Sequence, residues 1–272
     1  MTPSSRRSFL AGAGLVTTTA LAGCAGFVGR DVTEDSTQSY SPGSYAAVAI
    51  ENRNGDVRVE PATSGREEVE VEIRKRGRSQ DALDAVSVED TVEDDVLTLE
   101  SVYENRYSDV SVRLVVRLPE GISLASAATA NGDVLAEGVT GDVSLSSANG
   151  DAEAVDVDGY VSLSSANGDA IARGTTGIAG ASTGTGDVEV EVFALRDDVD
   201  LSSGNGDVEA GVAPDLDADV ELSVGNGDIE EEVEFTSRSS SPNRVEGRLG
   251  EGGPTLSCSS GNGDVRLYTL ES

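Results

Sequence analysis

The chain has 272 residues, with 50 acidic against 19 basic side chains and a formal net charge of −31 at pH 7. This charge argues against nucleic acid as a partner, because phosphate groups would be repelled, and it opposes a compact fold unless salt screens the repulsion. Acidic, lysine-poor chains rich in Gly, Ala and Val are typical of extreme halophiles, archaea above all. The absence of histidine excludes histidine-based metal sites and catalytic triads.

Residues 1–23 are predicted to be an export signal. Arg6 and Arg7 precede an apolar run over residues 9–22 that is too short to span a membrane. The pattern resembles a twin-arginine signal, which exports folded proteins. The run ends in Leu-Ala-Gly-Cys, which looks like a lipobox, although an ordinary cleaved signal with an incidental cysteine is the alternative. We therefore predict that a lipidated Cys24 anchors the chain to the outer face of the cell membrane.

Residues 24–44 are rich in Ser, Thr, Asp and Gly, and a disordered tether is predicted there. Over residues 45–120 apolar and polar residues alternate, as in half-buried strands. A short helix or loop is expected at residues 79–85. If Cys24 carries lipid, Cys258 has no disulfide partner, and we predict a buried structural thiol.

The most informative feature is a repeat within residues 121–270. Between residues 131 and 187 a glycine follows a short polar residue at every ninth position, and every second pair is followed by aspartate. A fixed period of 18 residues indicates a repeat architecture. The repeated asparagines of the Asn-Gly-Asp turns are Asn131, Asn149, Asn167, Asn205, Asn226 and Asn262, with a threonine variant at Thr185.

Two all-β architectures fit arcs of nine residues. A meander would use Asn-Gly as hairpin turns, whereas a β-solenoid would place one coil per 18 to 21 residues. The alternation of two turn types favours the solenoid, because a meander gives no reason for every second turn to match. Successive coils would lie about 4.8 Å apart, so that the asparagines form a hydrogen-bonded ladder. Residues 45–270 are then predicted to form one continuous domain.

The chain resembles a known family in four features taken together. They are the export signal, the alternating strands, the Val-Arg-Leu-Pro-Glu-Gly segment at residues 116–121 and the Asn-Gly-Asp repeats. The family is the "putative adhesin" β-strand-repeat domain of unknown function, found in many bacterial and archaeal envelope proteins. The resemblance covers about residues 45–270. It implies a right-handed β-solenoid-like fold and no catalytic residues.

The aspartates of the repeat, Asp133, Asp151, Asp169 and Asp187, admit more than one interpretation. The first is structural: Asn and Gly supply positive φ and the carboxylate caps backbone amides of the turn. The second is calcium, since stacked aspartates resemble the nonapeptide calcium roll. However, the glycine density here is lower than in that motif, so specific calcium sites are not expected and no cofactor is predicted.

A polysaccharide lyase or hydrolase on the solenoid is not expected either. Carboxylate pairs arise by chance among 50 acidic residues, and the chain has no tryptophan and only 4% aromatic residues for stacking a sugar. Tyr103 and Tyr107 form one local aromatic cluster that either packs over the end of the fold or contacts a partner.

The sequence thus predicts a non-enzymatic cell-envelope lipoprotein, an adhesin-like structural or interaction module. Its partners would be the membrane, through the anchor, and an envelope protein or glycan. The alternatives are a calcium-dependent surface binding module and an envelope-stress sensing element.

Overall fold

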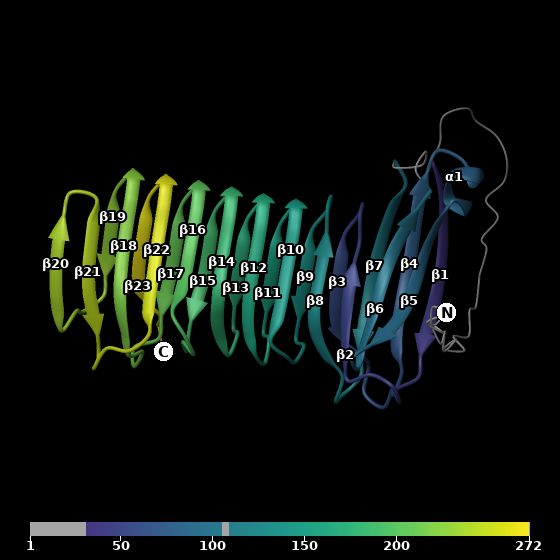
Figure 1. Ribbon diagram of the computed structural model, residues 1–272, viewed down its shortest axis with the longest axis horizontal. Coiled ribbons are helices and arrows are strands. Elements are labelled where there is room, and N and C mark those ends of the chain that lie inside the picture. Colours follow the sequence, from purple (N-terminus) through teal and green to yellow (C-terminus); the bar gives the residue numbers. More distant parts are fainter. Residues whose placement is uncertain (1–30, 105–108, 272) are drawn as a thin grey trace, which may run out of the picture.

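The structure is a computed structural model that describes residues 31–104 and 109–271. Its strands form two sheets that lie face to face along the whole length of the molecule (Figure 1). The described part contains one short helix, α1 (Gln80–Asp84). No helix in these residues has the length and apolar character needed to cross a membrane.

Sheet A has eleven strands and sheet B has twelve. In spatial order, sheet A consists of β1 (Val32–Tyr40), β4 (Val69–Gly77), β7 (Ser111–Leu118), β3 (Val57–Pro61), β9 (Val134–Glu137), β11 (Ala152–Val155), β13 (Ala170–Arg173), β15 (Val188–Val192), β17 (Val208–Val212), β23 (Val265–Thr269) and β19 (Ile229–Glu232). Sheet B consists of β20 (Ser237–Ser241), β21 (Arg244–Leu249), β18 (Ala218–Asn226), β22 (Thr255–Asn262), β16 (Val199–Asn205), β14 (Gly177–Thr185), β12 (Tyr160–Asn167), β10 (Val143–Asn149), β8 (Ser123–Thr129), β2 (Ala47–Glu51), β6 (Val96–Tyr103) and β5 (Val86–Glu93).

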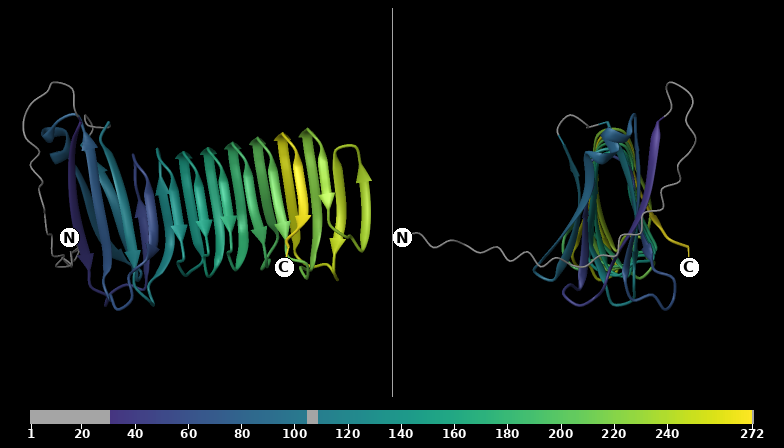
Figure 2. Two further views of the ribbon diagram at one scale, coloured as in Figure 1. Left: turned by 180° about the vertical axis from the view of Figure 1, so that it is seen from behind. Right: turned by 90° about the vertical axis from the view of Figure 1, so that its right-hand side faces the viewer.

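The central part is a β-solenoid, as predicted. Each coil contributes one strand to each sheet, and neighbouring coils pair in parallel. Leu145 of β10 lies beside Leu163 of β12, and Asn149 lies beside Asn167. This parallel register excludes a meander, whose neighbouring strands would run in opposite directions. Figure 2 shows the two sheets end-on as a flattened tube.

The core is a narrow layer between the sheets. Sheet B contributes large side chains such as Leu145 and Leu163, whereas the opposing rows of sheet A contain small ones such as Ala152 and Ala170, all fully or almost fully buried. Large residues that face small ones allow two sheets to pack closely. Alternation along each strand determines which residues face inward. Because many of these inward residues are small, the two sheets lie close together and the cross-section is flattened.

At the N-terminal end the structure corrects the predicted tether. Residues 32–40 form β1, which pairs antiparallel with β4 along its whole length, so the prediction of disorder over residues 24–44 is wrong for this stretch. Local composition is polar there, but Asp35 of β1 forms an ion pair with Arg74 of β4. The short helix expected near residues 79–85 is present: Ser79 caps α1 by accepting a hydrogen bond from the Ala82 amide.

At the other end the coils do not stack in sequence order. The C-terminal coil, β22 and β23, lies between the coil β16–β17 and the coil β18–β19, which contradicts the expectation that successive coils lie directly over one another. Between β18–β19 and the C-terminal coil the chain forms the antiparallel hairpin β20–β21, which extends sheet B outward (Figure 1).

Candidate interaction surface

One edge of the solenoid is formed by the Asn-Gly-Asp turns and by the variant turn Thr185-Gly186-Asp187. We call it the turn edge. Its glycines have positive φ, from +117° at Gly55 to +149° at Gly263, a region that L-residues with side chains rarely adopt. The coils also approach closely there. A β-carbon on Gly150 would lie 2.2 Å from the carbonyl oxygen of Gly132, and one on Gly168 would lie 2.3 Å from that of Gly150. Glycine is therefore required by backbone conformation and by stacking.

The turn edge starts one coil earlier than the repeat suggested. Asn54-Gly55-Asp56 belongs to it, because the Gly55 amide donates to the Asn131 carbonyl at 2.6 Å and Gly132 lies over Gly55. The repeat predicted from the sequence began only at Asn131. The triplet itself was a usable signal, but no regular spacing connects it to the others, because β4 to β7 intervene before the next coil.

The repeat aspartates connect neighbouring coils. Asp133 Oδ1 accepts a hydrogen bond from the amide of Asp151 at 3.0 Å, and the same contact joins Asp151 to Asp169 and Asp169 to Asp187, each at 2.8 Å. The series continues through Asp207, Asp264 and Asp228. Each carboxylate thus binds the amide of the following coil rather than its own turn.

The asparagines form a second ladder that follows spatial order. Asn149 Nδ2 donates to Asn131 Oδ1 and Asn167 Nδ2 to Asn149 Oδ1, both at 3.1 Å. Thr185 interrupts the series. Beyond it, Asn205 is followed by Asn262 and only then by Asn226, with two hydrogen bonds of 2.9 Å. The ladder therefore includes the asparagines we predicted but not in their sequence order.

Hydroxyl groups under the turn edge complete its hydrogen bonding. Ser147 Oγ donates to the carbonyl of Gly132 at 2.8 Å and Ser165 Oγ to that of Gly150 at 2.9 Å. Both serines are buried. A buried donor without a partner would be destabilising. The serines two residues before Asn149, Asn167, Asn205 and Asn262 each donate to a glycine carbonyl of the neighbouring coil.

These contacts leave little of the turn edge for a metal ion. One oxygen of each of the four predicted aspartates, Asp133, Asp151, Asp169 and Asp187, already accepts a hydrogen bond from a backbone amide. In residues 31–104 and 109–271 no group of three or more His, Cys, Asp or Glu residues is arranged to hold a metal ion. The contacts of the carboxylates are those of the structural interpretation, except that each carboxylate binds the amide of a neighbouring coil.

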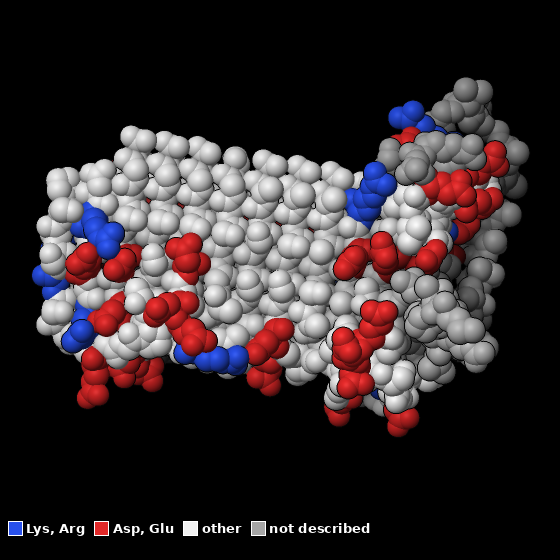
Figure 3. All heavy atoms as spheres, in the orientation of Figure 1, with Lys and Arg blue, Asp and Glu red and all other residues white. Residues whose placement is uncertain are grey.

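The middle of sheet B presents a flat surface without charges, although the chain as a whole is strongly acidic. We call it the uncharged face. It is formed by the outward residues Ser144, Ser146, Ala148, Ser162, Ser164, Ala166, Gly180, Ser182 and Gly184. Figure 3 shows this region free of charged side chains, with acidic groups gathered at its rim and at both ends. Glu51, Glu89 and Glu100 lie side by side toward the N-terminal end of the same sheet.

The comparison with known proteins identifies the family. The Toastrack DUF4097 family matches residues 48–268, which is most of the chain. The chain belongs to the Toastrack family. No curated protein matches it.

Several solved structures are similar to this Toastrack chain at low identity. A putative cell adhesion protein from Clostridium sporogenes is 10% identical, with 88% of this chain and 100% of that chain covered and a TM-score of 0.40. A putative adhesin from Bacteroides fragilis is 13% identical, with coverages of 89% and 97% and a TM-score of 0.39. A putative lipid binding protein from Parabacteroides distasonis is 13% identical, with coverages of 90% and 98% and a TM-score of 0.42.

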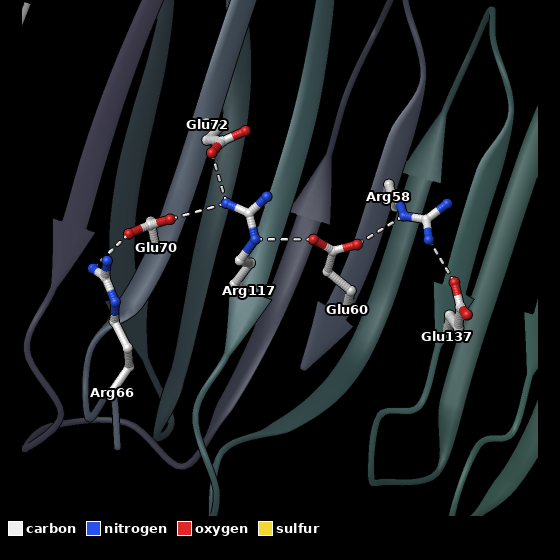
Figure 4. Close-up of polar contacts among 7 residues, drawn as sticks. All are labelled: Arg58, Glu60, Arg66, Glu70, Glu72, Arg117 and Glu137. Atoms are coloured by element: carbon white, nitrogen blue, oxygen red, sulfur yellow. Dashed lines mark hydrogen bonds and ion pairs between the residues drawn. The ribbon is translucent and has the colours of Figure 1, made fainter. Parts of the chain in front are cut away.

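Sheet A of the Toastrack chain carries a continuous network of ion pairs on its outer face (Figure 4). At its centre, Arg117 of β7 contacts Glu60 of β3 at 2.9 Å and Glu70 and Glu72 of β4 at 2.9 and 2.7 Å. The network extends through Arg58 to Glu137 and through Arg66 to Glu70. Burial opposes ionisation of Glu60, but hydrogen bonds from Arg58 and Arg117 outweigh it, so the pKa of Glu60 lies below its usual value. The network links strands and offers no free acid or base.

The other residues named in the sequence analysis either contribute to the fold or lie outside the described residues. Cys258 is fully buried, and burial raises the pKa of its thiol to about 12, which makes it unreactive. Tyr103 ends β6, and its hydroxyl donates to the Asn54 carbonyl at 3.3 Å beneath the Arg53 guanidinium. Tyr107, Arg6, Arg7 and Cys24 lie outside the described residues.

Proposed function

We propose that this Toastrack chain is a non-enzymatic, adhesin-like module of the cell envelope, exported through its twin-arginine signal and held at the outer face of the membrane by lipid on Cys24. The observation that carries the proposal is the uncharged face, a broad flat surface of small side chains in a chain of net charge −31. The turn edge and the ion-pair network are engaged in stabilising the fold. The uncharged face is not, and it can approach another surface without strong charge repulsion.

The anchor is tested by fractionating the cells that make the protein. The Cys24→Ser variant is expected to leave the membrane fraction and appear in the medium, because only the lipid would hold the exported chain. An Arg6→Lys/Arg7→Lys variant is the control for export and is expected to stay inside the cell. If the Cys24→Ser protein stayed membrane-bound to the same extent as wild type, the lipid anchor would be excluded.

The contact surface is tested by measuring how much fluorescently labelled protein binds to intact cells at molar salt. We expect Ser146→Asp/Ser164→Asp, in the middle row of the uncharged face, to reduce binding several-fold, because the added carboxylates must lose hydration on contact. The matched control is Ser237→Asp/Ser239→Asp, which adds the same charge to exposed residues of β20. Equal binding by both double variants and wild type would remove the uncharged face as the contact surface.

A further inference from the structure

The C-terminal coil fills a slot between two coils that precede it in the sequence. It pairs in parallel with β16 and β17 on one side and with β18 and β19 on the other. Cys258 lies between Leu201 and Leu222, and Asn262 lies between Asn205 and Asn226. The two walls of the slot are thus complementary to one particular segment, residues 255–269.

The slot holds this segment through buried side chains and through both ladders of the turn edge. Leu256, Cys258, Val265 and Leu267 are completely buried. The amide of Asp264 donates to Asp207 Oδ1 at 2.8 Å, and Asp264 Oδ1 in turn accepts from the amide of Asp228 at 2.8 Å. If the coil left the slot, its apolar walls would be exposed. Only the same coil of another copy could restore identical contacts with them.

The connection to this coil is a short glycine-rich loop. Residues 250–254 read Gly-Glu-Gly-Gly-Pro and link β21 to β22. Gly250 and Gly252 have φ of +54° and +82°, so the loop folds back through left-handed conformations that glycine tolerates. The hydrogen bonds that hold it run from the amide of Gly252 to the carbonyl of Leu249 at 3.0 Å, from the amide of Glu251 to Asp217 Oδ1 at 2.8 Å, from Thr236 Oγ1 to the carbonyl of Gly250 at 3.2 Å and from the amide of Asp219 to the carbonyl of Pro254 at 3.2 Å. Straightening the loop therefore disrupts little besides these contacts.

We propose that two copies of this chain exchange their C-terminal coils, each coil filling the slot of the other copy. Such a swap keeps every contact within the slot and changes only the loop at residues 250–254. The net charge of −31 opposes the approach of two copies at low ionic strength, and molar salt screens that repulsion over about 3 Å. The exchanged dimer is therefore a high-salt species, and it is independent of the function proposed above.

A disulfide can report which copy supplies the coil. The amide of Thr255, at the start of the coil, lies 2.7 Å from Asp198 Oδ1 in the loop after β15. The test protein carries Asp198→Cys and Thr255→Cys together with Cys24→Ser. The new disulfide is intramolecular when the C-terminal coil occupies the slot of its own chain. It links two chains when the coils are exchanged. We expect a covalent dimer on a non-reducing gel after oxidation at molar salt, in a fraction that rises with protein concentration. Only monomer at every concentration would overturn the proposal.

A second variant acts on the loop alone. Proline cannot adopt the φ of Gly252, so Gly252→Pro should disfavour the folded-back loop and raise the dimer fraction several-fold in light scattering at molar salt. Gly65→Pro is the matched control, because Gly65 has a φ of +86° in a turn with no neighbouring atom within 4 Å of its β-position. A folded Gly252→Pro protein that stayed as monomeric as Gly65→Pro would contradict coil exchange. If Gly252→Pro did not fold, the disulfide result would decide.

Discussion

Replacing Gly150 with alanine is expected to lower the free energy of unfolding by about 2 to 5 kcal/mol. The left-handed backbone of a non-glycine residue costs about 1 to 2 kcal/mol, and forcing extra atoms into a close-packed position adds about 1 to 3 kcal/mol. The new β-carbon would lie 2.2 Å from a backbone oxygen of the preceding coil, and neither backbone can move without disturbing the stack. A domain of this size should lose about 10 °C in melting temperature, measured by circular dichroism at molar salt.

The control for Gly150→Ala is Gly65→Ala. Gly65 also has positive φ, but no atom lies within 4 Å of its β-position. Only the conformational cost remains there, and the expected loss is about 1 to 2 kcal/mol. The excess loss at Gly150 therefore measures the stacking of one turn upon another. Equal losses at the two positions would show that the coils are not in close contact at the turn edge.

The solenoid was predictable because its information is local and repeated. When coils have equal length, chemically equal residues must lie over one another, so the period of 18 residues placed Asn149 beside Asn167 before any coordinates were known. The same reasoning applies to the inward row of Leu145 and Leu163, since alternation along a strand determines which residues face the core. In such a repeat, composition and spacing are sufficient to define the neighbours of a residue.

The order of the last coils was not predictable from the same pattern. Leu201, Cys258 and Leu222 are similar apolar residues at equivalent positions, and each of their coils can pair with either of the others. The repeat therefore predicts that a coil exists at residues 255–269 without specifying which coils flank it. The sequence signal for the insertion is the extra hairpin β20–β21, which appears only as a longer spacing between Asn226 and Asn262.

The strand at residues 32–40 was missed for a different reason. Its side chains are mostly polar, and Val32 and Tyr40 are its only large apolar residues, so local composition indicates a linker. Its residues pair with residues of β4 that lie 29 (Tyr40 with Val69) to 45 (Val32 with Gly77) positions further along the chain. The pairing includes ion pairs of Asp35 with Arg74 and of Glu34 with Lys75. Such long-range pairing leaves no local period. The candidate contact surface was missed similarly, because a lack of charge becomes visible only when the strands are assembled.

The Arg117→Ala variant is expected to lose about 2 kcal/mol of stability at neutral pH and low salt, since it leaves three carboxylates on neighbouring strands without their shared cation. Glu60 and Glu70 are less than a quarter exposed, so water compensates them poorly. Arg113 provides the control on the same strand, because its side chain is exposed and has no carboxylate partner among the described residues. Both variants raise the net negative charge by one, so the difference between them isolates the network. Chemical unfolding monitored at several salt concentrations measures it.

The pH dependence of that difference follows from the lowered pKa of Glu60. Because the folded-state pKa lies below the unfolded value of about 4.3, the folded state favours the ionised carboxylate, and its contribution is fully present above that pH. On acidification the contribution is lost as the pH falls through the folded-state pKa. Wild type and Arg117→Ala should therefore differ at pH 7 and converge well below pH 4, whereas Arg113→Ala should follow wild type throughout. A gap between Arg117→Ala and wild type that persisted unchanged to low pH would mean that lost packing of the arginine stem, rather than its charge, accounts for the loss.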